Sequence, residues 1–355
     1  MLFTTTPDDL LHWLRCTDAT ELEQLWAAAD TVRRDNVGDE VHLRGLIEVS
    51  NHCVRSCTYC GIAKEHTELT RYRMTTEEVL AAANDALAMG YGTVVMQAGE
   101  DYGLTRTWVA DVIRQIKART GLAVTLSLGE RPEGDLAAWK EAGADRYLMR
   151  FETSNRELFS KIHADFGKRP SDRIAQLKRM RELGYEIGSG IMAGIPGQTF
   201  ADLINDLETF RTLDLDMIGI GPYLPHPATP LGRDAVGIFA DTTDQVPTGE
   251  LITLKLVALT RLVCPRANIP STTALATINK QNGRELGLQR GANIVMPNLT
   301  PVRYRALYEI YPSKACIDET AEQCHACLGG RIRSIGRIPG QGPGSAINRN
   351  VGASA

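Results

Sequence analysis

The arrangement of apolar and polar residues divides most of the chain into amphipathic helical segments and short apolar runs rich in β-branched residues. From residue 43 onward the two kinds alternate, and a glycine such as Gly90, Gly121 or Gly184 closes the helical segment before the next run. Strands that alternate with helices form a parallel sheet, and eight such units can close into a barrel. We therefore predict an α/β fold, a complete (βα)8 TIM barrel of parallel strands. An open doubly wound sheet is the alternative, because the periodicity of the sequence does not show whether the sheet closes. The predicted strands are residues 43–50, 93–97, 123–128, 146–151, 186–192, 217–220, 269–272 and 293–296.

Four segments of different character follow from this pattern. Residues 1–40 form a helical segment of two amphipathic helices, and Thr6-Pro7 has the residue types of a helix start. Residues 41–300 form the barrel, and residues 301–335 form a C-terminal extension. Residues 336–355 are rich in Gly, Pro, Ser and Asn, so we expect a disordered tail.

Composition and charge exclude several classes of protein. The 355 residues include 39 basic and 43 acidic side chains, and the net charge of −4 argues against a nucleic-acid binder that depends on phosphate contacts. No apolar run of about 18 residues occurs, and the N-terminus lacks the features of a signal peptide, so we expect no membrane association. We therefore expect a cytoplasmic protein whose eight cysteines stay reduced.

The strongest chemical signal is the trio Cys53, Cys57 and Cys60, which follows the first predicted strand with the spacing C-x3-C-x2-C. Three thiolates on one short loop can bind three irons of a [4Fe–4S] cluster and leave the fourth iron open for chemistry. The alternatives are reduced, unligated thiols or a zinc site with His52 as the fourth ligand. The zinc site is disfavoured because His52 adjoins Cys53 and would have to bend back.

A second trio, Cys316, Cys324 and Cys327, lies in the predicted extension with the spacing C-x7-C-x2-C. It predicts a further [2Fe–2S] or [4Fe–4S] cluster on or near the surface, and a vestigial or adventitious site is the alternative. The remaining cysteines, Cys16 and Cys264, are expected to be buried structural residues.

Unusual residues gather near the carboxyl ends of the predicted strands, the edge at which parallel barrels build their sites. Arg150 and Glu152 flank Phe151 at one such end, and charges in this position are rarely buried without a partner, which favours function. For Pro196 and Pro222, turn formation is an equally good explanation. The sequence therefore predicts a site at this edge of the barrel.

The cysteine spacing with an aromatic residue, Tyr59, before the third cysteine is the signature of the radical S-adenosylmethionine (SAM) superfamily. Within that superfamily, the chain from about residue 43 to about residue 330 resembles the HydE-type maturases of [FeFe]-hydrogenases. The resemblance is carried by LRGLIEVSNHC, VMQAGED, KEAGADRYLMRFET, MAGIPGQT, DMIGIGPYLPHPATPL and the second cysteine trio. Biotin synthase and 3-methylornithine synthase share the layout but are less similar.

This resemblance implies a cofactor and roles for individual residues. In such enzymes the open iron binds SAM, and reductive cleavage gives a 5′-deoxyadenosyl radical, so we expect Cys53, Cys57, Cys60 and Arg150 to be catalytic. The stretch around Arg173 is slightly longer here than in these relatives, and the usual Gly-Gly-Glu after the second strand is Ala98-Gly99-Glu100. The positions that match SAM contacts are Tyr59, Gln97, Glu152, Arg173 and Met217. The positions that match the internal anion or substrate cavity are Thr125, Arg150, Thr272, Thr273, Met296 and Tyr308.

The resemblance also implies a reaction and partners. The expected substrate is a small organometallic or amino-acid-derived molecule, a cysteine-bound Fe(CO)2(CN) synthon supplied by a tyrosine-cleaving radical SAM maturase. The product is expected to reach a scaffold GTPase, and an electron donor is required. The alternatives are an enzyme like 3-methylornithine synthase or biotin synthase and, from another class, a non-catalytic iron–sulfur carrier.

Overall fold

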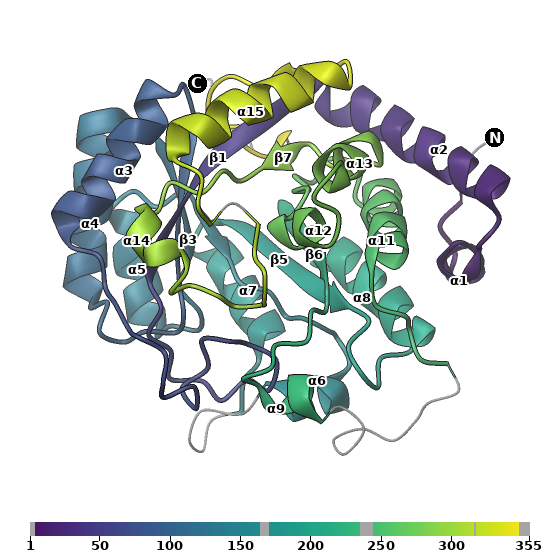
Figure 1. Cartoon of the computed structure of the whole chain (residues 1–355), viewed down its shortest axis with the longest axis horizontal. Coiled ribbons are helices and arrows are strands. Elements are labelled where there is room, and N and C mark those ends of the chain that lie inside the picture. The colour runs from purple at the N-terminus through teal and green to yellow at the C-terminus, as the bar shows by residue number, and fades with distance from the viewer. Residues whose placement is uncertain (1–3, 164–169, 235–243, 316, 348–355) are drawn as a thin grey trace.

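The computed structural model describes residues 4–163, 170–234, 244–315 and 317–347, and shows a barrel of parallel strands surrounded by helices (Figure 1). The strands are β1 (Glu40–Ser50), β2 (Thr93–Ala98), β3 (Ala123–Ser127), β4 (Arg146–Leu148), β5 (Glu186–Ala193), β6 (Met217–Pro222), β7 (Ile294–Val295) and β8 (Ile338–Pro339). The helices are α1 (Pro7–Arg15), α2 (Ala19–Val37), α3 (Thr76–Ala88), α4 (Arg106–Thr120), α5 (Glu133–Glu141), α6 (Arg156–Ile162), α7 (Arg173–Glu182), α8 (Phe200–Thr212), α9 (Pro230–Arg233), α11 (Glu250–Val263), α12 (Thr273–Ile278), α13 (Gly283–Gln289), α14 (Val302–Arg305) and α15 (Ala321–Ser334).

The strands of the barrel follow the order β6-β5-β4-β3-β2-β1-β7, with parallel pairing between neighbours. Residues 268–270 complete the ring between β6 and β7. Asn268 pairs with Met217 of β6, and Pro270 pairs with Ile294 of β7. The Asn268 carbonyl accepts a hydrogen bond of 2.9 Å from Ile218 N. The predicted α/β barrel of parallel strands is thereby confirmed.

Several predicted strands are shorter than the sequence suggested, such as 293–296, of which only Ile294–Val295 is strand, and one is absent. The run 269–272 forms no regular strand, because Pro270 has no N–H to donate and Thr272 is the N-cap of α12. The run 146–151 ends as β4 at Leu148. Beyond it the chain still forms a parallel bridge with β5 at Glu152, which takes a left-handed φ of 61°.

Local capping fixes several helix starts at the residues that the sequence indicated. Thr75 accepts a hydrogen bond from Glu78 N while the Glu78 carboxylate accepts one from Thr75 N, which completes a capping box at α3. Thr199 and Asp202 form the same arrangement at α8, and Thr6 caps α1. These bonds satisfy N–H groups that a helix leaves without an internal partner.

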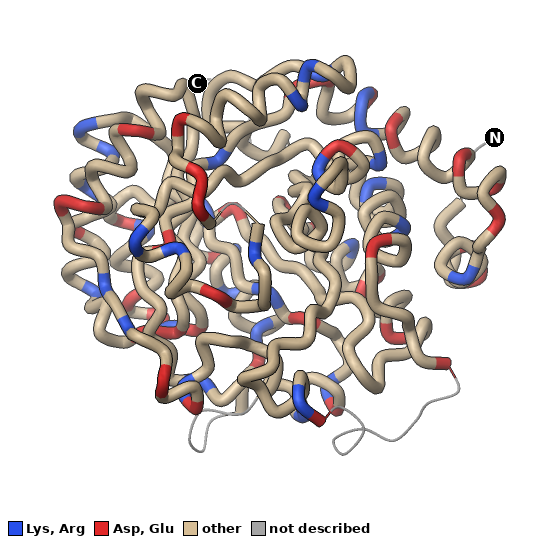
Figure 2. The backbone as a smooth tube through the Cα atoms, in the orientation of Figure 1, with Lys and Arg blue, Asp and Glu red and all other residues tan. Residues whose placement is uncertain are grey.

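The N-terminal helices pack on the outside of the barrel, where α2 contacts α11 and α1 contacts α8. Lys255 of α11 is buried and donates a hydrogen bond of 3.0 Å to the Leu14 carbonyl at the end of α1. Acidic and basic residues are interspersed over the outer helices (Figure 2), as the near-neutral net charge suggests. No helix in the described ranges has the length and apolar character needed to cross a bilayer.

Residues 336–347 pack against the amino-terminal end of the barrel, where β8 pairs with the start of β1. Arg44 Nη2 donates to the Gly344 carbonyl at 2.9 Å, and Arg146 Nη2 donates to the Pro343 carbonyl at 3.1 Å. The prediction of a disordered tail is therefore wrong for these residues. The composition suggested disorder because it gives no sign that buried arginines supply donors to the backbone of the tail.

Candidate active site

A cavity of about 320 Å³ occupies the barrel at the carboxyl ends of the strands and extends inward to Arg44. Its lining includes every residue that the sequence analysis assigned to the first cysteine trio, to SAM or to the substrate: Cys53, Cys57, Tyr59, Cys60, Gln97, Thr125, Arg150, Glu152, Arg173, Met217, Thr272, Thr273, Met296 and Tyr308. The structure therefore brings these residues together around one space. Of the second trio, Cys324 is buried and Cys327 is exposed on α15, away from this lining. Cys316 lies outside the described residues.

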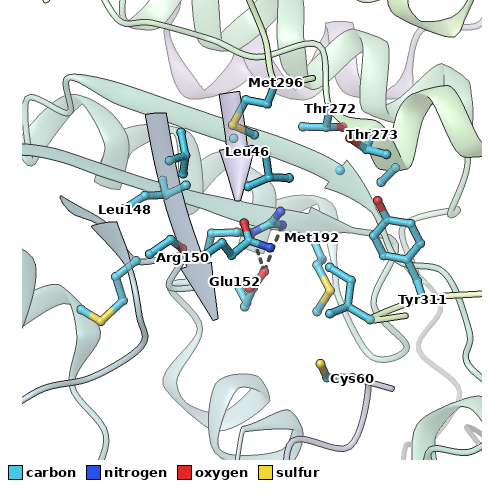
Figure 3. A pocket seen from close by; sticks show the side chains of 18 of the residues that line it. Leu46, Cys60, Leu148, Arg150, Glu152, Met192, Thr272, Thr273, Met296 and Tyr311 are labelled. Atoms are coloured by element: carbon cyan, nitrogen blue, oxygen red, sulfur yellow. Dashed lines mark hydrogen bonds and ion pairs between the residues drawn. The ribbon is translucent and has the colours of Figure 1, made fainter. Parts of the chain in front are cut away.

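The cavity has two chemically different ends (Figure 3). Cys60 lies at one end, and Met296, Thr272 and Thr273 lie at the other. Arg150 and Glu152 lie between these two groups. A ligand that spans the cavity would therefore meet sulfur, then paired charges, then hydroxyl groups.

The loop that carries the first cysteine trio is held by backbone hydrogen bonds from several directions. Val54 N donates to the Glu100 carbonyl and Gly61 N donates to the Ile310 carbonyl, both at 3.0 Å. Gly99 permits the close approach of this loop to the end of β2, because a Cβ there would lie 2.3 Å from the His52 carbonyl oxygen. The loop geometry is therefore built by the barrel as well as by the loop itself.

Burial controls the protonation of the three thiols. It raises the pKa of Cys60 to about 12, and it raises the pKa values of Cys53 and Cys57 above the usual range. The described cysteines form no disulfides. No three His, Cys, Asp or Glu side chains in the described ranges converge on a single metal ion. In an iron–sulfur cluster each thiolate binds a different iron, so this donor set fits a multi-iron cluster better than mononuclear zinc.

A buried ionic network, which the sequence analysis did not identify, surrounds Cys57. Cys57 Sγ lies 2.9 Å from His163 Nδ1, and Arg173 Nη2 lies 3.1 Å from His163 Nε2. Glu130 accepts from Arg173 Nε at 3.2 Å and pairs with Arg55 at 3.1 Å. Burial alone would raise the pKa of Glu130, but its contacts with Arg173, Ser171 and Arg55 hold that pKa well below its usual range. Burial and the Arg173 charge lower the pKa of His163 to about 4, so its imidazole is neutral.

The sequence could have indicated one residue of this network, Glu130, but not His163. Glu130 follows Gly129 just beyond β3, so its place at a strand end was a usable signal. His163 lies at the end of α6 and reaches the cysteine loop only through tertiary packing. Nothing in the local pattern around His163 pointed to a metal centre.

Arg150 and Glu152 form an ion pair inside the cavity, with Arg150 Nη2 3.0 Å from Glu152 Oε2. Glu152 is buried, and Arg150 is partly exposed to the cavity. Arg173 Nη1 donates to the Arg150 carbonyl at 2.6 Å, which ties this pair to the network around Cys57. The two charges thus lie at the predicted edge of the barrel and pair with each other, and their functional role stays a prediction.

The hydroxyl groups at the inner end of the cavity differ in their hydrogen-bond partners. Thr272 Oγ1 donates to the Ile220 carbonyl at 3.0 Å, whereas Thr125 Oγ1 is buried without a hydrogen-bond partner in the structure. Gln97 Nε2 donates to Tyr308 Oη at 3.3 Å, which joins a β2 residue to the extension. Because a buried hydroxyl without a partner is costly, Thr125 is well placed to bind a ligand.

Residues 306–315, here called the strap, cover one side of the cavity and carry Tyr308, Tyr311 and Lys314 into its lining. Lys314 Nζ forms a buried ion pair with Glu48 of β1, and Asn298 Nδ2 donates to the other carboxylate oxygen at 3.1 Å. Of these three residues, only Tyr308 was predicted from the sequence. The strap joins the cavity directly to the segment that contains the second cysteine trio.

Comparisons with known proteins identify the family of this chain. Residues 47–210 match the family model of the radical SAM superfamily. The chain is 46% identical over 336 residues to the [FeFe] hydrogenase maturase subunit HydE of Thermotoga maritima, and the match covers 95% of this chain and 92% of that protein. It is 29% identical to the 3-methylornithine synthase of Methanosarcina acetivorans, with coverage of 82% and 79%.

Solved structures show the same fold at lower identity. Methylornithine synthase superposes with a TM-score of 0.78 at 24% identity, with coverage of 96% of this chain and 95% of that chain. HydG, a maturase of the [FeFe]-hydrogenase, superposes with a TM-score of 0.75 at 19% identity, with coverage of 94% and 72%. These likenesses concern the fold alone.

Proposed function

Because this chain belongs to the HydE family of [FeFe]-hydrogenase maturases within the radical SAM superfamily, we propose that its barrel cavity directs radical chemistry at a small cysteine-bound iron–carbonyl–cyanide synthon. The family membership makes the chain a radical SAM enzyme of hydrogenase maturation. The observation that carries the proposal is the convergence of three neighbouring thiols, the Arg150–Glu152 ion pair and an unpartnered hydroxyl on one cavity.

Cys53, Cys57 and Cys60 are the proposed ligands of a [4Fe–4S] cluster with one open iron. When bound, the cluster supplies the electron that cleaves SAM into methionine and a 5′-deoxyadenosyl radical. The role of the protein here is to hold the three thiolates in a buried environment and to keep water away from the reacting groups. The raised thiol pKa values mean that cluster binding must release the protons.

The residues between the cysteine loop and the middle of the cavity are the proposed SAM site. The Glu152 carboxylate can accept hydrogen bonds from ribose hydroxyls or the amino group, and the Arg173 guanidinium can attract the methionine carboxylate. Tyr59, Gln97 and Met217 complete the proposed site from the cysteine loop, β2 and β6. This placement would orient the adenosyl group toward the inner end of the cavity.

The inner end is the proposed substrate site. Thr125, Thr272 and Thr273 offer hydroxyl groups, and Arg150 offers a cation for an anionic or cyanide-bearing ligand. Met296 and Tyr308 supply the remaining contact surface. Such a set suits a small anion enclosed on several sides better than a polymer or a lipid.

We also propose that Cys316, Cys324 and Cys327 bind an accessory [2Fe–2S] or [4Fe–4S] cluster. Cys324 and Cys327 are three residues apart on α15 and thus lie on neighbouring positions of one helix face. The proposed partners are an electron donor, a tyrosine-cleaving radical SAM maturase and a scaffold GTPase.

Two rival functions make different predictions. A lysine mutase like 3-methylornithine synthase is favoured by the 29% identity to that enzyme and would convert lysine. A non-catalytic iron–sulfur carrier needs neither the Arg150–Glu152 ion pair nor a cavity that extends beyond the cysteines.

The test uses anaerobically reconstituted full-length protein with dithionite and SAM, followed by measurement of 5′-deoxyadenosine. We expect the wild type to cleave SAM, Cys57→Ala to lose at least a hundredfold in cleavage rate, and Cys264→Ala, at a cysteine outside the cavity lining, to show no change.

A second assay adds the protein to a hydrogenase maturation mixture that lacks this maturase. Absence of cleavage with an intact cluster would overturn the enzyme mechanism, and lysine turnover without maturation would favour the mutase.

A further inference from the structure

His163 is a buried imidazole in direct contact with one of the proposed cluster ligands. Its ring is fully withdrawn from solvent, and its Nδ1 lies 2.9 Å from Cys57 Sγ. The other ring nitrogen, Nε2, faces Arg173 Nη2 at 3.1 Å. The imidazole therefore lies between a sulfur atom and a guanidinium group.

The Arg173 contact determines which nitrogen carries the proton. A guanidinium group only donates hydrogen bonds, so His163 Nε2 must present its lone pair to Arg173. An imidazole whose Nε2 accepts a hydrogen bond carries its hydrogen on Nδ1. Glu130 Oε1 is the competing neighbour of Nε2, but it is 3.5 Å away and already accepts from Arg173 Nε. The Nδ1 hydrogen thus points to Cys57.

The surrounding structure fixes the ring in this orientation. The His163 ring lies against Phe159, with a distance of 4.8 Å between ring centroids, and His163 N donates to the Phe159 carbonyl at 2.8 Å. Thr58 N donates to the Ile162 carbonyl at 3.0 Å, which ties the cysteine loop to the end of α6. The imidazole and the sulfur are therefore positioned by elements that are bonded to each other.

We infer that His163 is a positioning residue whose Nδ1–H donates a hydrogen bond to the Cys57 sulfur and favours the reduced form of the cluster. The inference rests on the proposed [4Fe–4S] cluster at Cys53, Cys57 and Cys60. Reduction adds negative charge to the cluster and its sulfur ligands, and a fixed N–H dipole stabilises that charge. Arg173 contributes indirectly, because it selects the tautomer that supplies the donor.

The experiment compares reconstituted wild type, His163→Leu and His163→Asn by EPR-monitored redox titration. Leucine removes the donor, and the asparagine amide can place an N–H near the position of Nδ1. At a fixed potential we expect the ratio of reduced to oxidised cluster to fall about tenfold in His163→Leu, which is about 59 mV for one electron. His163→Asn should lie within about threefold of the wild type. His226→Leu is the matched control, a buried histidine beside Gly61 without a recorded contact to a cysteine sulfur, and should leave the ratio unchanged.

Equal ratios in wild type and His163→Leu, at equal iron content, would overturn the inference while leaving the cluster in place. Failure of the wild type to form an EPR-active cluster would instead overturn the proposed function. A second measurement needs no variant: pulsed EPR of the reduced wild type labelled with 15N-histidine. We expect a weak 15N coupling through the N–H···S contact, and its absence would also overturn the inference.

Discussion

Glu48 and Lys314, which are 266 residues apart in the chain, form an ion pair that is almost completely withdrawn from solvent. Glu48 belongs to β1, and Lys314 belongs to the strap that covers one side of the cavity. Lys314 Nζ also donates to the Tyr308 carbonyl at 3.2 Å within the strap. The pair therefore fastens the strap to the first strand of the barrel.

Breaking this pair on one side should be costly. Lys314→Met leaves the Glu48 carboxylate buried without its cation, and we expect the free energy of unfolding to fall by about 3–5 kcal/mol. Combining it with Glu48→Gln removes the stranded charge and should recover more than half of that loss. Urea titration of the wild type, both single variants and the double variant measures the coupling, and simple additivity would show that the two groups do not interact.

We expect the unpartnered hydroxyl of Thr125 to bind a ligand and to contribute little to the stability of the fold. In Thr125→Val, which keeps the shape of the side chain, we expect unchanged or higher thermal stability, because no hydrogen bond within the described structure is lost. Maturation activity should fall about tenfold, the cost of one hydrogen bond to a bound ligand.

Thr260 offers a matched comparison, since its buried hydroxyl also has no recorded partner but lies on α11 outside the cavity lining. Thr260→Val should leave both stability and activity close to the wild type. Equal activity of the two valine variants would remove Thr125 from the substrate site.

Burial raises the pKa of Asp206 to about 7, even though Ser154 N and Oγ both donate to its Oδ1. The folded protein therefore keeps this proton up to about pH 7, whereas the unfolded chain releases it near pH 4. Between these values the folded state binds more protons, so stability falls as the pH rises through this window.

Asp206→Asn removes that dependence while keeping the Oδ1 acceptor. We expect its stability advantage over the wild type to grow by about 1–3 kcal/mol between pH 5 and pH 8. Thermal unfolding of both proteins at several pH values provides the measurement. A constant difference between the two would show that Asp206 is ionised throughout.

The packed tail should contribute to stability through its backbone carbonyls. Truncation after Pro339 removes the acceptors for Arg44 and Arg146, and we expect a loss of about 2–4 kcal/mol in the free energy of unfolding. Truncation after Ile347 keeps those bonds and is the control. If both truncated proteins have the same free energy of unfolding, the contacts of Arg44 and Arg146 with the tail add nothing to stability.

Much of this molecule was predictable because its signals are local or periodic. The apolar runs gave most of the strands, and the capping box of Thr75 and Glu78 gave the start of α3. Cys53, Cys57 and Cys60 share one loop, so their spacing alone indicated a common site. Residues at the ends of parallel strands, such as Arg150, meet at one edge, which is why they line the same cavity.

The features that were missed depend on contacts between distant segments. His163 and Lys314 come from a helix end and from the extension, where no period or motif marks a site. The segment 269–272 does not form the expected strand. Pro270 has no N–H to donate, so the segment pairs with its neighbours only through isolated bridges. Composition also misjudged residues 336–347, because disorder depends on available partners as well as on residue types.

The hydrogen bond between Arg44 and the Gly344 carbonyl spans 300 positions of the chain, and that between Thr93 and the Pro343 carbonyl spans 250. During synthesis each of these acceptors follows its donor by most of the length of the barrel. Arg44 and Thr93 can therefore make these bonds only after the intervening strands and helices have been made. Closing this end of the barrel is thus a long-range step of folding, which no local segment can complete by itself.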